Sequence, residues 1–144
     1  MIEIAPLRPE DRAGWEALAR GYKAFYNDPL PDEAYERTWR RLIADEEIHG
    51  LAARLDGRMA GFANYLFHPH SWRADNCYLQ DLFTTPDSRG KGVATALVDA
   101  VADAARARGA GAYYWLTKED NRTARALYDR IARWKGFLRY DYPL

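Results

Sequence analysis

The sequence predicts an α/β fold over one domain, residues 1–144. Stretches that alternate apolar and polar side chains, the pattern of strands, lie between stretches whose apolar residues recur every three or four positions, the pattern of amphipathic helices. One strand–helix–strand unit, residues 76–116, requires its two strands to run parallel. We therefore expect a mixed, mostly antiparallel sheet with one parallel strand pair and flanking helices.

The chain begins with a predicted strand and two predicted helices. Residues 1–7 alternate apolar and polar side chains before prolines stop the run. Residues 9–11 open the first helix, where acidic side chains complement the helix dipole. Prolines and aspartates in residues 27–32 end that helix, and the apolar spacing over residues 35–43 predicts the second.

A hairpin and a third strand follow. Residues 48–55 and 59–67 are apolar runs on either side of Asp56-Gly57, and this arrangement is the strongest short-range signal for a β-hairpin. Residues 76–84 form the next predicted strand, which stops before a proline because proline cannot donate to a strand ladder.

The last third of the chain predicts two helices and two strands. Apolar side chains recur every fourth position over residues 93–108, and Gly109 ends this helix. Residues 112–116 read as a short buried strand, residues 123–134 as a helix and residues 137–142 as a closing strand.

The composition excludes several classes of protein. The chain is 48% hydrophobic and has 21 basic and 21 acidic side chains, so it can bury a core but lacks the positive charge of a protein that coats nucleic acid. No apolar run approaches the roughly 20 residues that span a bilayer. A single cysteine, Cys77, rules out an intrachain disulfide, and residues 1–12 lack a signal-peptide pattern. We expect a cytoplasmic protein that binds neither nucleic acid nor membrane.

Residues 82–94 carry the clearest chemical pattern, a strand that enters a tight loop and then a helix. A helix N-terminus presents unpaired N–H groups, and Gly90 and Gly92 allow the backbone to approach a bulky anion. Arg89 and Lys91 add positive charge, so we expect a diphosphate to bind here. The P-loop motif is excluded because a glycine follows the lysine, and the dinucleotide fingerprint is excluded because its third glycine is absent.

Two segments resemble the GNAT (GCN5-related) N-acetyltransferases. Residues 89–94 resemble the family's Arg/Gln-x-x-Gly-x-Gly/Ala signature, whose loop holds the pyrophosphate of acetyl-CoA, and residues 121–128 are similar to its Asn-x-x-Ala-x-x-Leu-Tyr segment. The stretches 78–83 and 114–117 look most like the branch that contains the yeast D-amino-acid and histone/polyamine acetyltransferases. The resemblance implies the GNAT fold, in which the parallel strand pair is splayed, and acetyl-CoA as co-substrate.

The resemblance also assigns roles to individual positions. Main-chain groups of the strand before the loop would bind the pantetheine arm and the thioester oxygen, and here these are Leu82, Phe83 and Thr84. Asn121 would cap the following helix or bond the coenzyme, and Ala124 belongs to the same cofactor segment. The positions that match the pyrophosphate loop are Arg89, Gly90, Lys91, Gly92, Val93 and Ala94.

Tyr128 matches the family's tyrosine that protonates the coenzyme thiolate. The match is chemically sensible because a phenol of pKa about 10 can donate to a thiolate whose conjugate acid has a pKa near 8.5. In the same fold, the segment that contains Tyr22, Phe25 and Tyr26 helps to build the pocket for the acceptor.

The general base has several candidates. Deprotonating an alkylamine of pKa about 10.4 costs about 4–5 kcal/mol at pH 7, so a group must take the proton. Many relatives have a glutamate where this chain has Gln80. Asp81 is our catalytic candidate, although in a regular strand it faces the opposite side and only a bulge would re-aim it. Glu119 and Asp120, near the cofactor loop, are weaker candidates.

Other chemically suggestive residues favour structural interpretations. Pro69 interrupts the pair His68 and His70, and Cys77 is not at ligand spacing from them, so we expect no metal site. Without an adjacent histidine, Cys77 is expected to be a buried thiol and not a nucleophile.

The sequence therefore predicts an acetyl-CoA-dependent N-acetyltransferase that transfers the acetyl group directly, in a ternary complex, to a small amine, amino acid or polyamine. Residues 1–72 hold 9 basic and 12 acidic side chains, which mildly favours a cationic acceptor. Two alternatives are a non-catalytic acyl-CoA-binding or regulatory module, which Gln80 favours, and a protein lysine or N-terminal acetyltransferase. The apolar strand at residues 137–142 would suit addition to a partner's sheet, which favours a homodimer.

Overall fold

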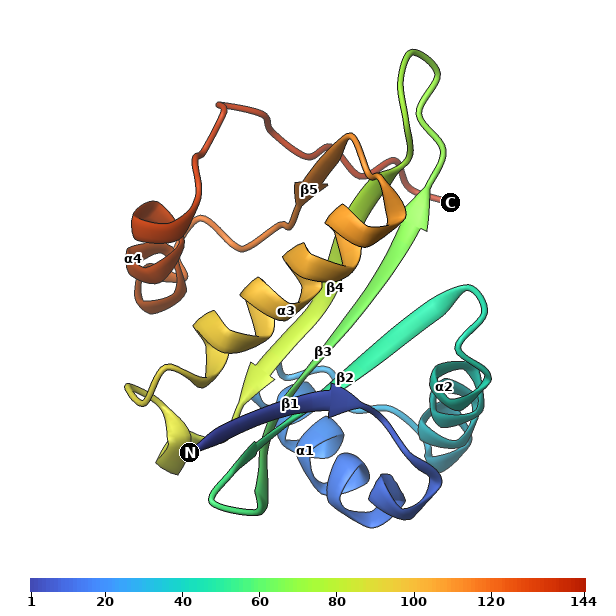
Figure 1. The fold of residues 1–144 in the computed structure, drawn as a ribbon, viewed down its shortest axis with the longest axis vertical. Helices are drawn as coiled ribbons and strands as arrows, with labels where there is room; N and C mark the ends of the chain where they lie inside the picture. Colours follow the sequence, from blue (N-terminus) through green and yellow to red (C-terminus); the bar gives the residue numbers. More distant parts are fainter.

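Five strands form one sheet in the order β1-β2-β3-β4-β5 in the computed structural model, which describes residues 1–144 (Figure 1). All neighbours are antiparallel except β4 and β5, which are parallel. The strands are β1 (Ile2–Pro6), β2 (Ile48–Leu55), β3 (Arg58–His68), β4 (Asn76–Thr84) and β5 (Ala112–Tyr114). The helices are α1 (Arg12–Phe25), α2 (Asp32–Ala44), α3 (Val93–Arg108) and α4 (Arg122–Ile131). The predicted mixed sheet with one parallel pair is confirmed.

The β2–β3 hairpin closes where the sequence predicts. Asp56 and Gly57 both have positive φ, 51° and 82°, which is the backbone of a tight hairpin turn whose twist matches that of the strands. Short 3₁₀ turns, Pro9–Asp11 and Pro86–Ser88, precede α1 and the α3 loop.

Helices cover both faces of the sheet. Side chains alternate between the faces along β3, so Ala63 packs in the core under α3 whereas Phe62 packs with Leu18 of α1. Figure 1 shows α3 crossing one face, with α1 and α2 grouped on the opposite side, near β1 and β2. Trp15 and Trp39, whose ring centres are 5.1 Å apart, join α1 to α2 in a second core cluster.

A β-bulge in β4 changes which face its side chains reach. Asn64 pairs with Asp81 but the next β3 residue, Tyr65, pairs with Leu79, so Gln80 has no partner in the ladder. Before the bulge, Leu79 packs in the core under α3. After the bulge, the residue that packs against this core is Leu82. Asp81 is thereby turned toward α1.

The parallel pair of strands is short. Only three register pairs join β4 to β5, from Asn76–Ala112 to Tyr78–Tyr114. The rest of β4, Leu79 to Thr84, has no strand partner on its β5 side, as expected for a splayed pair.

The structure corrects the prediction for the end of the chain. No strand forms over residues 137–142, α4 ends at Ile131 and not at residue 134, and β5 ends at Tyr114. A strand needs a partner, and residues 133–144 make no main-chain hydrogen bond within the chain. The large apolar side chains of this segment are mostly exposed, and they are Trp134, Phe137, Leu138, Tyr140, Tyr142 and Leu144. We call residues 132–144 the C-terminal segment.

Candidate active site

The loop before α3 leaves a row of main-chain amides without partners. Gly90 and Gly92 have φ of +75° and +85°, a backbone that glycine adopts without strain. Gly92 is the N-cap of α3, no side chain caps the helix, and the first main-chain bond runs from Ala96 N–H to Gly92 C=O. The N–H groups of Val93, Ala94 and Thr95 are therefore unpaired within the chain.

Charge and burial around this loop suit an anion held by main chain. Arg89 and Lys91 are exposed, and the guanidinium of Arg89 lies 5.5 Å from the centre of the Phe25 ring. Val93 is 1% exposed, so its side chain anchors the helix in the core while its amide faces the loop. The loop for which the sequence predicts diphosphate binding thus combines unpaired main-chain amides with two exposed cationic side chains.

The end of β4, just before this loop, has main-chain groups on its β5 side that no other strand pairs with. Leu82, Phe83 and Thr84 pair with β3 on one side only. Phe83 is buried against α1 and Leu82 packs on the α3 core, so both side chains serve the interior. The β5 side of this stretch has no strand partner.

Asp81 lies near this edge and is held by two neutral donors. The Tyr22 hydroxyl donates to Asp81 Oδ1 at 3.0 Å, and Asn64 Nδ2 donates to Asp81 Oδ2 at 3.0 Å. No arginine, lysine or histidine forms an ion pair with Asp81. The chain thus presents a half-buried carboxylate without a counter-cation of its own.

Burial raises the pKa of three tyrosines, Tyr22, Tyr26 and Tyr128. Burial, followed by the charge of Asp81, raises the pKa of Tyr22 and of Tyr26 above the usual value. Burial, followed by the proximity of Tyr26, raises the pKa of Tyr128. The Tyr128 ring packs on Trp115 with 5.3 Å between centres. Tyr128 therefore carries a proton at neutral pH and is available as a donor.

Asn121 caps α4, as the sequence predicts. Its Oδ1 accepts from the Ala124 N–H at 3.4 Å, and its Nδ2 donates to Thr117 Oγ1 at 3.3 Å. This cap fixes the start of the helix that carries Tyr128.

The other base candidates lie elsewhere. Gln80 is exposed at the bulge. Glu119 and Asp120 are exposed and line an open depression of about 510 Å³ with Arg122 and Arg125.

Sequence reasoning alone does not identify the two donors to Asp81. It places Tyr22 only in a pocket wall and singles out no role for Asn64. The available signal was an asparagine inside an otherwise apolar strand, because a polar side chain at a core position calls for a partner.

His68 makes local hydrogen-bonding contacts through both ring nitrogens. The ring nitrogens of His68 lie 2.9 Å from the carbonyl oxygen of Pro69 and 2.8 Å from the Tyr114 hydroxyl. No group of three or more His, Cys, Asp or Glu side chains is arranged to hold a metal ion.

None of the helices is long and apolar enough to cross a bilayer.

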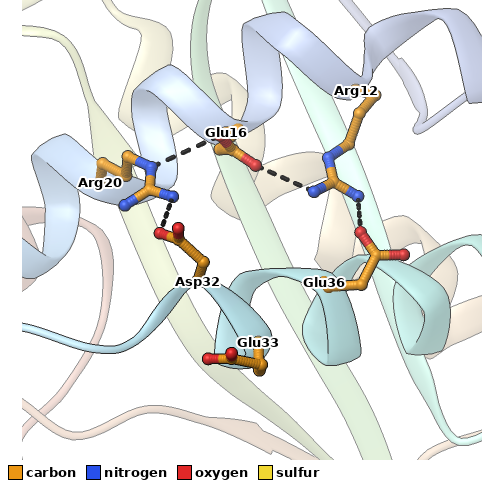
Figure 2. A pocket seen from close by; sticks show the side chains of 6 residues that line it. All are labelled: Arg12, Glu16, Arg20, Asp32, Glu33 and Glu36. Atoms are coloured by element: carbon orange, nitrogen blue, oxygen red, sulfur yellow. Dashed lines mark hydrogen bonds and ion pairs between the residues drawn. The ribbon is translucent and has the colours of Figure 1, made fainter.

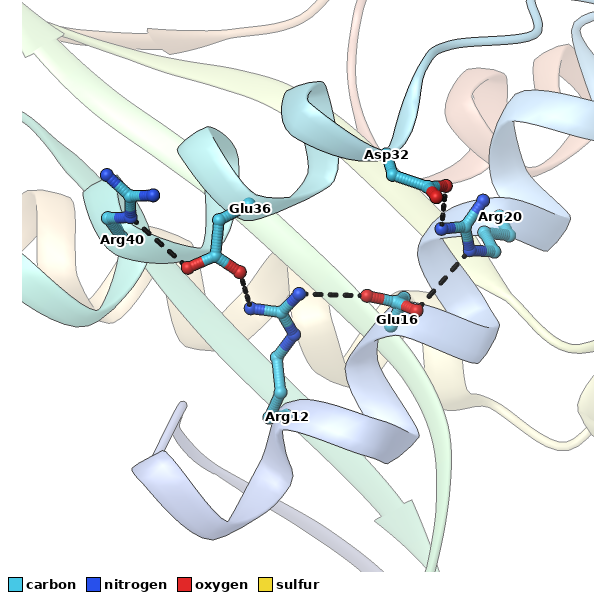
Figure 3. A network of polar contacts seen from close by, with 6 residues as sticks. All are labelled: Arg12, Glu16, Arg20, Asp32, Glu36 and Arg40. Carbon is cyan, nitrogen blue, oxygen red and sulfur yellow. Dashed lines mark hydrogen bonds and ion pairs between the residues drawn. The ribbon is translucent and has the colours of Figure 1, made fainter.

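A polar depression between α1 and α2, of about 340 Å³, serves the scaffold (Figure 2). Arg12 bridges Glu16 and Glu36, at 2.9 and 2.7 Å, and Arg20 bridges Glu16 and Asp32, at 3.4 and 2.8 Å. Figure 3 shows these contacts as one chain of ion pairs that links the two helices. These ion pairs join α1 to α2, and Glu33, which also lines the depression, forms no ion pair.

The sheet order, the splayed pair and the glycine loop at α3 match a known family. The model of the acetyltransferase (GNAT) family matches residues 15–132. The chain belongs to the GNAT family. It is accordingly an acyltransferase, as the resemblance implied.

Relatives of this GNAT chain include characterised acetyltransferases. The D-amino-acid N-acetyltransferase HPA3 of Saccharomyces cerevisiae is 33% identical over 91% of this chain and 84% of its own length. The uncharacterized N-acetyltransferase YhfO of Bacillus subtilis is 28% identical over 96% and 95%. A thialysine N-epsilon-acetyltransferase of Caenorhabditis elegans is 28% identical over 64% of this chain and 58% of its own.

Solved structures confirm the GNAT fold. AAC(6')-Iy in complex with the bisubstrate analogue CoA-S-monomethyl-acetylneamine superposes with a TM-score of 0.88 at 18% identity, covering 100% of this chain and 98% of that one. A ribosomal-protein-alanine N-acetyltransferase from Brucella melitensis biovar Abortus 2308 superposes with a TM-score of 0.83 at 25% identity, covering both chains fully.

Proposed function

We propose that this enzyme transfers the acetyl group of acetyl-CoA directly to a small cationic amine, amino acid or polyamine in a ternary complex. The observation that carries the proposal is the Asp81 carboxylate of β4, which accepts hydrogen bonds from Tyr22 and Asn64 but has no counter-cation within the chain. A cationic amine supplies the positive charge that the chain does not provide. The names of the relatives, which refer to D-amino acids and thialysine, support an amine acceptor of this kind.

The residues of the α3 loop fit the coenzyme. The unpaired amides of Val93 and Ala94, with Gly90 and Gly92 and the charges of Arg89 and Lys91, would hold the pyrophosphate. The free main chain of Leu82, Phe83 and Thr84 would bond the pantetheine arm and the thioester oxygen, with Asn121 and Ala124 on the opposite side of the splay. Bound there, acetyl-CoA supplies an activated acetyl thioester.

Asp81 and Tyr128 would divide the proton transfers. Asp81 accepts a proton from the ammonium group of the acceptor, so that the amine nitrogen has a free lone pair for attack. Tyr128 holds the proton that the departing thiolate needs, and its raised pKa keeps that proton in place at neutral pH.

An acceptor screen tests the proposal. The purified protein is incubated with acetyl-CoA and a panel of amines of graded charge, and both thiol release and product mass are followed. We expect turnover with cationic amines and amino acids. Turnover restricted to neutral or acidic amines contradicts the cationic preference, and saturable acetyl-CoA binding without release under any acceptor establishes the non-catalytic module.

A protein amino group is the second candidate acceptor. The full-length superposition on a ribosomal-protein-alanine N-acetyltransferase supports it. Peptides with free N-termini or lysines therefore belong in the same screen, and faster turnover of a peptide than of any small amine would favour this candidate.

We also propose a cytoplasmic homodimer. The apolar C-terminal segment has no partner within the chain, and β5 pairs on one side only, so a second copy can supply what each lacks. The single free thiol, Cys77, is consistent with a reducing compartment.

A further inference from the structure

Both oxygens of the Asp81 carboxylate are occupied by donors from different elements, Tyr22 from α1 and Asn64 from β3. We infer that Tyr22 and Asn64 are positioning residues, which hold the Asp81 carboxylate in the orientation that takes a proton from the acceptor amine. The inference rests on the proposed role of Asp81 as the base. An ionised carboxylate oxygen accepts about two hydrogen bonds, so each oxygen keeps one free position for the amine.

The Tyr22 hydroxyl is fixed by the packing of its ring. The ring stands edge-on to Phe62 at 5.7 Å, to Phe83 at 5.8 Å and to Tyr26 at 5.1 Å between centres. A ring held on several sides keeps its hydroxyl in one place. The raised pKa of Tyr22, caused by burial and then by Asp81, keeps the hydroxyl a donor.

Asn64 is placed at a cost to the fold, which argues for a functional reason. It is 5% exposed, and its Oδ1 is buried without a hydrogen-bond partner within the chain. A buried, unpaired carbonyl oxygen is destabilising, and an apolar side chain of similar size would avoid the penalty. Turning the amide over would set Oδ1 against Asp81 Oδ2, so the contact with Asp81 fixes this orientation.

The bulge at Gln80 brings the three groups together. Without it, strand alternation would keep Asp81 on the α3 face with Leu79, away from Tyr22 and Asn64. The extra residue turns Asp81 toward α1 at the point where Asn64 lies opposite in the register.

Other charged and titratable groups lie around Asp81, but its side-chain hydrogen bonds come from Tyr22 and Asn64 alone. The charge of Asp81 acts on Tyr26, which follows α1, and on Tyr78 of β4, and neither tyrosine forms a hydrogen bond with it. Two basic side chains lie near these tyrosines. The Lys118 Nζ is 5.8 Å from the centre of the Tyr26 ring, and the positive charge of Arg139 acts to lower the pKa of Tyr78.

A split between kcat and KM tests the inference. Removing one donor leaves the Asp81 carboxylate less firmly oriented, so Tyr22→Phe, which keeps the ring, and Asn64→Leu should each lower kcat for a cationic acceptor roughly tenfold, the value of about one hydrogen bond to a charged group. The KM for acetyl-CoA should stay within about twofold of wild type, because neither donor belongs to the α3 loop. Tyr65→Phe is the matched control, because Tyr65 follows Asn64 on β3 but packs against the α3 core, and its kcat should not change.

Asp81→Asn distinguishes a failure of the base from a failure of the positioning role. If Asp81→Asn keeps kcat within twofold of wild type, the proposed base is wrong. If Asp81→Asn lowers kcat but a donor variant leaves kcat at the wild-type value, or lowers it as much in the Asp81→Asn background as in wild type, the positioning role of that donor is overturned. Tyr22→Phe keeps the test decisive if Asn64→Leu does not fold.

Discussion

The environment of Tyr128 suits a proton donor and does not suit a nucleophile, which would need to lose its proton. Burial and the nearby phenol of Tyr26 raise its pKa, so the protonated form persists to higher pH than for an exposed tyrosine. It lies on a helix whose start is fixed by the Asn121 cap. Its position is thus set by α4 and its protonation state by burial.

Replacing Tyr128 by phenylalanine should slow acetyl transfer without loosening the fold. We expect kcat to fall roughly 10²–10⁴-fold, the usual contribution of a general acid, with little change in acetyl-CoA affinity. Because the active form is protonated and the pKa is raised, wild-type kcat should show no alkaline loss from this group below about pH 10. Tyr140→Phe, in the exposed C-terminal segment, is the control. A Tyr128→Phe rate within twofold of wild type rules out the acid role.

At the scale of elements, the α3 loop combines positive φ with unpaired amides. At Gly92, where φ is +85°, an added Cβ would meet open space apart from an ordinary 3.8 Å contact with Ile2. A side chain there is therefore opposed by backbone strain and by obstruction of the loop, and not by clashes with the core.

Gly92→Ala should impair coenzyme binding and stability together. Strain of about 1–2 kcal/mol should lower Tm by a few degrees. The KM for acetyl-CoA should rise roughly tenfold, equivalent to about 1.4 kcal/mol. Gly109→Ala is the matched control, since Gly109 has φ +77° and open space for a Cβ but caps the opposite end of α3 from the loop. An equal Tm loss in both variants with unchanged KM in Gly92→Ala would contradict the assignment of the loop.

Elements that depend on local pattern were predictable from the sequence. The hairpin follows from Asp56-Gly57, α3 from its apolar spacing and Gly109, and the cap of α4 from Asn121. Each of these signals lies within a few residues of the structure that it specifies.

Features that depend on distant partners were not predictable. The orientation of Asp81 is set by a bulge and by Tyr22, which lies 59 positions away in the sequence. The C-terminal segment has the composition of a strand, but a strand also needs a partner, and this segment does not pair with the free edge of β5.

At the scale of the whole molecule, the C-terminal segment is unusual because, in a single copy of the chain, its apolar side chains stay exposed. Figure 1 shows it leaving α4 and running back past β5 as irregular chain. Side chains such as Phe137, 83% exposed, and Tyr140, 87% exposed, are more apolar than a solvated tail requires.

Removing residues 134–144 should convert a dimer to a monomer. We expect light scattering of the full chain at micromolar concentration to give twice the 16.6 kDa chain mass, and the truncated chain, which keeps α4, to give a single-chain mass. A full chain that is monomeric under these conditions refutes the dimer and leaves the segment without a partner of this kind.

Asp81, as the group that receives the proton of a cationic acceptor, is central to the proposed activity of the whole enzyme. The most direct measurement is acetyl transfer to the best cationic amine of the screen, by wild type and by Asp81→Asn, with acetyl-CoA binding measured in parallel. We predict that the substitution lowers kcat/KM for the amine roughly 10²–10⁴-fold while acetyl-CoA binds as before. Turnover within twofold of wild type would contradict this role of Asp81.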